Sequence, residues 1–147
     1  MFERYTEKAR RVIFFARYEV SEFGSPEIET EHLLLGLLRE NETLVGQFLN
    51  SAQSMESIRK RLLEHFPIRE KIPTSVDLPL SEECKRVLTY AEEEAECLQK
   101  MHIGPEHLLL GILREERPFA AELLREHGMQ LDEVRRQLTT MHGEMGT

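Results

Sequence analysis

The sequence predicts an all-α domain of eight helices, arranged as two pseudo-symmetric four-helix repeats that pack together. The main observation is a motif that occurs twice, as TEHLLLGLLRE at residues 30–40 and as PEHLLLGILRE at residues 105–115. Nine of its eleven positions are identical, and the copies are offset by 75 residues. A match of this length indicates two copies of one unit. The second observation is composition, since Glu and Leu abound whereas β-branched residues are scarce.

The doubled motif predicts the central helix of each repeat. It is apolar on almost every side, which is typical of a buried helix. A glycine in mid-helix, Gly36 or Gly111, costs roughly 1 kcal/mol relative to alanine, so we expect close helix packing as the compensation. We expect each helix to end in solvent at its Arg-Glu pair. The predicted core contains Leu34, Leu37, Leu38, Leu109, Ile112 and Leu113.

The flanking segments predict three further helices in each repeat. Thr6 and Ser81 are suitable N-caps for the first helices, and apolar residues follow both at helical spacing. Third helices are expected at residues 44–49 and 119–124, and fourth helices carry Met55, Ile58, Leu62 and Leu63, or Leu131, Val134 and Leu138.

Proline positions set the expected domain organisation. The stretch 67–80 contains three prolines and is predicted to be a linker, because proline cannot sit inside a helix. The first repeat then covers residues 1–66 and the second covers 81–142. The glycine-containing tail, residues 143–147, is expected to fray.

Charge and hydropathy restrict the partners. The net charge is −8, of which −1 falls in residues 1–75 and −7 in residues 76–147. This acidic balance argues against nucleic acid or an anionic membrane as partner and leaves proteins open. We find no apolar run near the ~18–20 residues that span a bilayer, and no signal peptide at the start, so the expected location is cytoplasmic. Cys84 and Cys97 lie about 20 Å apart along one predicted helix and are expected to be free thiols.

The sequence offers little for catalysis. It lacks the phosphate-binding G-x-x-x-x-G-K-[ST], H-E-x-x-H and C-x-x-C motifs, so we expect no catalytic site, no metal and no cofactor. Two of the six histidines, His32 and His107, recur in both copies. They lie in separate repeats, and a hydrogen-bonding role at the helix start is favoured over metal ligation.

Two acidic residues, Glu31 and Glu106, have two interpretations. The simpler one is that each carboxylate complements the positive end of its own helix. In the second, each carboxylate is part of a binding site beside the start of its own repeat's first helix. The carboxylate attracts a cation, while Thr6 or Ser81 and the free backbone N–H groups attract an anion.

The doubled motif, the opening MFERYTEKARRV and the 75-residue period resemble the Clp repeat domain. This is the N-terminal domain of the Clp/Hsp100 AAA+ unfoldases, and the ClpC type is the most similar. The resemblance covers about residues 1–140. It implies a mobile binding module that recruits adaptors and protein substrates to an ATP-driven ring feeding the ClpP protease, with ATPase activity in other modules.

The resemblance also implies a pocket for phosphoarginine in each repeat. Glu31 and Glu106 would bind the guanidinium, and Thr6 and Ser81 would bind the phosphoryl group. The first copy keeps a base, Lys8, after its hydroxyl residue.

Three acidic residues depart from the family pattern: Glu29 replaces a glycine that Gly104 keeps, and Glu82 and Glu83 follow the second hydroxyl residue. A carboxylate there repels a phosphoryl group, so the first pocket is expected to dominate.

Two functions remain open from the sequence. The chain is either a substrate- and adaptor-docking domain of a Clp unfoldase, or a stand-alone regulatory protein that docks on a Clp complex or its adaptors. An enzyme is a distant third. A monomer is expected in either case.

Overall fold

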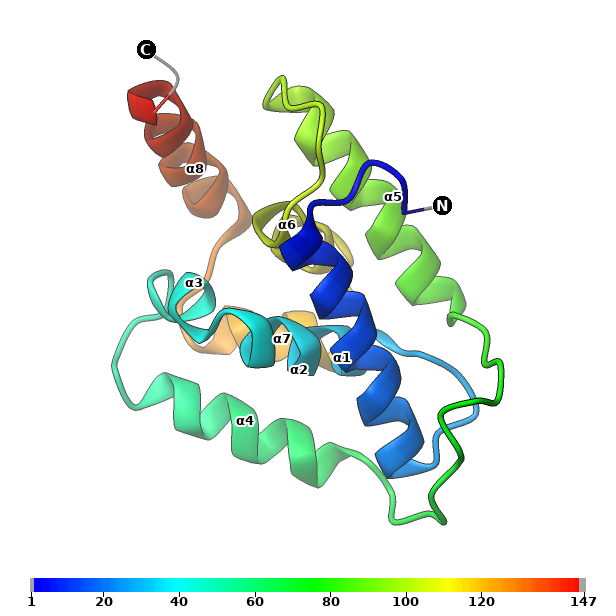
Figure 1. Cartoon of the computed structure of the whole chain (residues 1–147). Helices are drawn as coiled ribbons and strands as arrows, with labels where there is room; N and C mark the ends of the chain where they lie inside the picture. The colour runs from blue at the N-terminus through cyan, green and yellow to red at the C-terminus, as the bar shows by residue number, and fades with distance from the viewer. Residues whose placement is uncertain (1, 146–147) are drawn as a thin grey trace.

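The computed structural model describes residues 2–145 and, from residue 142 onward, the backbone alone. Its helices are α1 (Glu7–Phe23), α2 (Thr30–Glu40), α3 (Glu42–Gly46), α4 (Ser54–His65), α5 (Glu82–Cys97), α6 (Pro105–Arg114), α7 (Phe119–Glu126) and α8 (Leu131–Met145). Within the described residues the only extended pairing consists of two isolated bridges. The predicted all-α fold of eight helices is therefore confirmed (Figure 1).

The two motif helices, α2 and α6, lie at the centre of the molecule. Figure 1 shows α1 crossing α2 in the first repeat, and α5 packs on α6 in the same way in the second. All six residues of the predicted core are at most 4% exposed and belong to one continuous cluster. Burial of this apolar face is the main stabilising contribution to the fold.

The motif glycines sit where two helices touch. A Cβ atom on Gly36 would lie 2.4 Å from the carbonyl oxygen of Val12, and one on Gly111 would lie 2.4 Å from the carbonyl oxygen of Val87. Such distances are far below van der Waals contact, so only glycine allows α1 to approach α2, or α5 to approach α6, this closely. The close packing predicted from the mid-helix glycines is confirmed.

The predicted N-caps are also confirmed. The hydroxyl oxygen of Thr6 accepts a hydrogen bond from the Ala9 backbone N–H at 3.1 Å, and that of Ser81 accepts one from the Cys84 N–H at 3.0 Å. Each bond satisfies a donor that the first turn of a helix leaves unpaired.

The glutamates at the ends of the motif are not in solvent, contrary to the sequence-based expectation. Glu40 receives two hydrogen bonds from the Arg11 guanidinium, the shorter at 2.9 Å, and Glu115 receives two from Arg86, the shorter at 3.0 Å. The glutamate side chains are only 9% and 10% exposed. These paired bonds join the first helix of each repeat to its central helix.

The third helix differs between the repeats. α3 has five residues and ends at Gly46, so the helix expected over 44–49 is shorter and begins earlier, whereas α7 has eight. In the fourth helix of the first repeat, Leu63 is 47% exposed and does not join the core.

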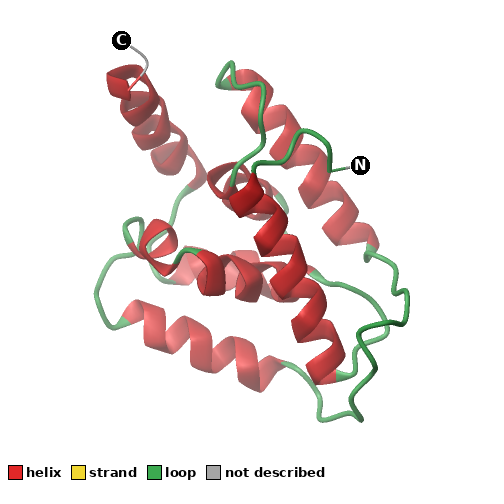
Figure 2. Ribbon diagram, in the orientation of Figure 1, coloured by secondary structure: helices red, strands yellow, loops and turns green. Residues whose placement is uncertain are grey.

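A long loop connects α4 to α5 and runs past the C-terminal end of α1 (Figure 2). Arg17 donates hydrogen bonds to the carbonyl oxygens of Thr74 and Val76, and the Ile72 N–H donates to the Ser21 carbonyl oxygen at 3.0 Å. The predicted linker is thus held against α1. At the other end of the chain α8 is helical to Met145, and the last two residues of the expected tail lie outside the described residues.

Candidate functional site

The start of each first helix lies beside the central helix of the other repeat. Tyr5 pairs with Ile103 just before α6, and the Thr6 N–H donates to the Ile103 carbonyl oxygen at 3.0 Å. Leu80 pairs with Ile28 in the equivalent way, just before α2. The sequence-based prediction that each acidic residue lies beside the first helix of its own repeat was therefore wrong. Thr6 lies near Glu106, and Ser81 lies near Glu31.

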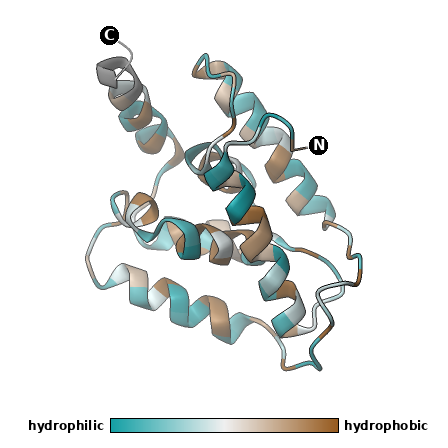
Figure 3. Cartoon of the chain, in the orientation of Figure 1, coloured by the Kyte–Doolittle hydropathy of each residue, from teal (hydrophilic) through white to brown (hydrophobic). Residues whose placement is uncertain are grey.

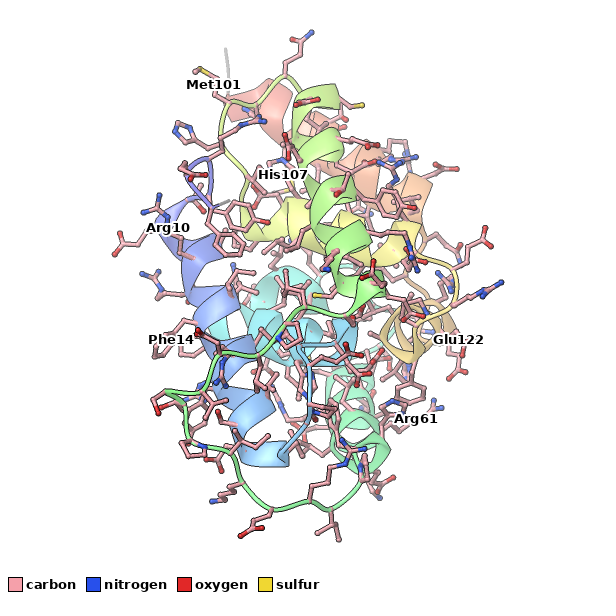
Figure 4. All side chains as sticks on the ribbon, turned by 90° about the vertical axis from the view of Figure 1, so that its right-hand side faces the viewer. Arg10, Phe14, Arg61, Met101, His107 and Glu122 are labelled. Atoms are coloured by element: carbon pink, nitrogen blue, oxygen red, sulfur yellow. The ribbon has the colours of Figure 1, made fainter. Side chains whose placement is uncertain are left out.

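A cavity of about 440 Å³ opens between the start of α1 and the start of α6. Its lining residues are Thr6, Leu44, Lys100, Met101, His102, Glu106, His107, Leu138 and Met141. We name it the Thr6–Glu106 cavity. Figure 4 shows Met101 at the tip of the loop before α6 and His107 deeper in the molecule. The cavity therefore combines an acid, a base and a helix start with an apolar wall.

Gly104 makes room for the Glu106 carboxylate. A Cβ atom on Gly104 would lie 2.3 Å from Glu106 Oε1, so any other residue would displace this side chain. Glu106 is 26% exposed, and its Oε1 lies 3.6 Å from Nδ1 of His107. The carboxylate is thus partly desolvated but still reachable from the cavity.

Glu31, the equivalent residue of the first repeat, has a structural role. Its Oε2 accepts a hydrogen bond from the Ala120 N–H at 3.0 Å, and the residue is 6% exposed. α7 begins after Pro118, whose side chain has no acceptor, so Glu31 acts as the cap. In the first repeat Asn41 caps α3 through the Leu44 N–H at 3.1 Å. Glu106 is not used in this way and faces the cavity instead.

The surroundings of Glu31 are acidic and buried. Burial raises the pKa of Glu29, and the neighbouring charges of Glu31 and Glu27 raise it further. Burial and the charge of Glu31 also raise the pKa of the Cys84 thiol to about 12. Ser81 is buried, whereas its equivalent Thr6 is only partly buried. This corner is poorly suited to an anionic ligand.

The basic group of the cavity is Lys100 rather than Lys8. Lys8 is exposed on α1 and is not among the lining residues, whereas Lys100 lies in the loop before α6. Sequence reasoning missed Lys100 because the repeat places Ser25 at the equivalent position. The available signal was its closeness to the motif, five residues before Pro105.

The two recurring histidines act at helix starts, as predicted. Nδ1 of His32 accepts a hydrogen bond from the Glu29 N–H at 3.0 Å, and Nδ1 of His107 accepts one from the Gly104 N–H at 2.9 Å. The His32 ring also stacks on Phe66, with ring centroids 4.4 Å apart. Burial lowers the pKa of His32 to about 4.

Among the described residues, no three His, Cys, Asp or Glu side chains are grouped so that they could hold a metal ion. In this same part of the chain, no helix combines the length and the apolar character that crossing a membrane requires.

Comparisons with known proteins agree on one family for this chain. The family model described as the Clp repeat (R) N-terminal domain matches residues 4–127. The chloroplastic chaperone protein ClpC of Pisum sativum is 38% identical over 144 residues, which cover 98% of this chain and 16% of that protein. The chain therefore spans about a sixth of this relative's length.

Two solved structures share the fold. The N-terminal domain of ClpD from Arabidopsis thaliana superposes with a TM-score of 0.68 at 24% identity, covering 96% of both chains. A ClpV N-domain in complex with a VipB peptide gives a TM-score of 0.72 at 16% identity, covering 93% of this chain and 86% of that one. With a family model over most of its length and a relative 38% identical along nearly all of it, the chain belongs to the Clp N-terminal domain family.

Proposed function

We propose that this chain is a protein-docking domain of an ATP-dependent Clp unfoldase and that it holds one side chain of the docked protein in the Thr6–Glu106 cavity. The observation that carries the proposal is the Glu106 carboxylate, which faces a cavity also lined by Lys100 and the start of α1. An acid and a base in one partly desolvated site favour a ligand that carries both charges. The related ClpV N-domain, solved with a VipB peptide, supports a peptide ligand.

Phosphoarginine fits the chemistry of this cavity. Its guanidinium would pair with Glu106, while its phosphoryl group would meet Lys100 and the backbone N–H groups at the start of α1, where a helix favours anions. Its aliphatic stem would pack against Leu44 and Leu138, which belong to the apolar wall. Adaptor proteins and substrates that carry this mark are the proposed partners.

Calorimetric titration with phosphoarginine, arginine and inorganic phosphate tests the proposal. Phosphoarginine should bind more tightly than either of the others, because arginine lacks the phosphoryl group beside the guanidinium and inorganic phosphate lacks the guanidinium. Glu106→Gln should weaken it by roughly tenfold or more, since a hydrogen bond to a charged group contributes about 1.5–3 kcal/mol. An absence of saturable binding by the parent chain, or equal affinity in the Gln variant, would overturn the phosphoarginine proposal.

A further inference from the structure

The outer face of α1 carries a group of apolar side chains that the core does not bury. Phe14 is 68% exposed and Tyr18 is 39% exposed, one helical turn apart. The Phe14 ring lies 5.9 Å from that of Phe15. Figure 3 shows the hydrophobic band halfway along α1, and Figure 4 shows Phe14 and Arg10 on the same edge of the helix. The face therefore presents aromatic surface to solvent.

Arg39 at the end of α2 and Leu63 of α4 extend this surface. The Arg39 guanidinium carbon lies 4.6 Å from the Phe15 ring centroid and 5.1 Å from that of Tyr18. Arg39 also lines a shallow depression of about 240 Å³ together with Leu63 of α4, which is 47% exposed. We define the α1 face as Phe14, Phe15, Tyr18, Arg39 and Leu63.

The second repeat is an internal control for what the fold requires. It keeps the arginine over an aromatic ring, with the Arg114 guanidinium carbon 4.2 Å from the Tyr90 ring centroid. The positions equivalent to Phe14, Tyr18 and Leu63 hold exposed polar residues: Thr89, Glu93 and Thr139. The shared cation–π contact thus belongs to the fold, whereas the extra apolar residues occur in the first repeat alone. Exposed apolar surface that the fold does not need is typical of an interaction site.

The positive charge of α1 favours an acidic partner. Residues 7–19 contain four basic and two acidic residues, whereas the equivalent stretch 82–94 contains two basic and five acidic residues. One of the two acids, Glu19, is paired with Arg39 at 3.8 Å. Lys8 and Arg10 are exposed beside the aromatic residues. A basic helix face with aromatic anchors complements a segment that has carboxylates around an apolar side chain.

We propose that the α1 face docks an acidic segment of a partner protein, anchored by an aromatic or aliphatic side chain against Phe14, Tyr18 and Leu63. None of the five residues of the α1 face lines the Thr6–Glu106 cavity. The proposal therefore does not depend on which ligand that cavity binds.

Selection of displayed random short peptides on the 147-residue chain tests this docking site, followed by fluorescence anisotropy with the enriched peptides. The peptides should be rich in Asp and Glu around an apolar anchor, and their binding should weaken at high salt. The double variant Phe14→Thr/Tyr18→Glu, which takes the residues of the second repeat, should lower affinity by roughly tenfold or more, as loss of aromatic anchors does. Leu63→Thr provides a second, single-site variant, and should weaken binding in the same direction.

Two controls separate this face from other surfaces. Ile68→Thr removes a fully exposed apolar side chain from the linker, and Glu106→Gln alters the cavity; both should leave peptide affinity unchanged. Failure to enrich any peptide, peptides without an acidic bias, or equal binding by the double variant would overturn the proposal. So would self-association in sedimentation that the double variant abolishes, because the occupant would then be a second copy of this chain.

Discussion

The Glu31 carboxylate accepts a hydrogen bond from the backbone N–H of Ala120 at 3.0 Å, and this bond joins the central helix of the first repeat to the third helix of the second. Glu106 occupies the same place in the other copy of the motif but faces the Thr6–Glu106 cavity. Two glutamates in nearly identical motifs thus have different surroundings. The first stabilises the packing of the repeats, and the second remains available to a ligand.

The central helix should be highly sensitive to truncation. Leu34 is fully buried, so Leu34→Ala removes apolar contacts and leaves a cavity that the surrounding helices fill only in part. The free energy of unfolding of this variant, measured by urea denaturation, should be lower than that of the parent protein by roughly 2–5 kcal/mol. A loss below about 0.5 kcal/mol, the size typical of surface sites, would contradict the central position of α2.

Adding a methyl group at the helix crossings should destabilise the protein. Gly36→Ala and Gly111→Ala gain roughly 1 kcal/mol of helix propensity. Their new Cβ atoms, however, would press on backbone carbonyl oxygens at 2.4 Å and separate the helices. A net loss of about 1–3 kcal/mol is expected in denaturation experiments. Gly46→Ala is the matched control, because its Cβ would lie 3.4 Å from the flexible end of Met55. Equal stability of all three variants would exclude close packing as the role of the motif glycines.

Acid should destabilise the protein through His32. Its pKa is lowered from 6.5 to about 4, chiefly by burial. Between these values the unfolded chain binds a proton that the folded chain does not. The contribution of His32 is therefore fully present above about pH 6.5, and on the order of 3 kcal/mol is lost as the pH falls toward 4. An NMR titration of the imidazole should give a midpoint well below 6 in the folded protein and near 6.5 in urea. Matching midpoints would show that His32 is not shielded from water.

Much of the fold was predictable, because its signals are local or periodic. The core of α2 and α6, the caps at Thr6 and Ser81 and the close approach at Gly36 all follow from residue type and spacing. The ion pair between Arg11 and Glu40 was missed, since no pattern within one helix shows which charged residues its neighbour will bring close.

The site was harder to predict, because two nearly identical motifs do not reveal which copy supplies the partner of each first helix. The backbone hydrogen bond from Thr6 to Ile103 decides this pairing, and it has no side-chain signal in the sequence. The division of roles between Glu31 and Glu106 depends on residues outside the motif, namely Pro118, which cannot cap α7, and Asn41, which caps α3.

The most direct test compares Glu31→Ala with Glu106→Ala, each measured for unfolding in urea and for phosphoarginine binding by calorimetry. Glu31→Ala should lose about 1–3 kcal/mol of stability, because the buried Ala120 N–H loses its acceptor, while its affinity stays within about twofold. Glu106→Ala should keep the parent stability within about 0.5 kcal/mol and bind roughly tenfold or more weakly. Equal losses of affinity in the two variants, or a loss confined to Glu31→Ala, would contradict the assignment of ligand binding to Glu106.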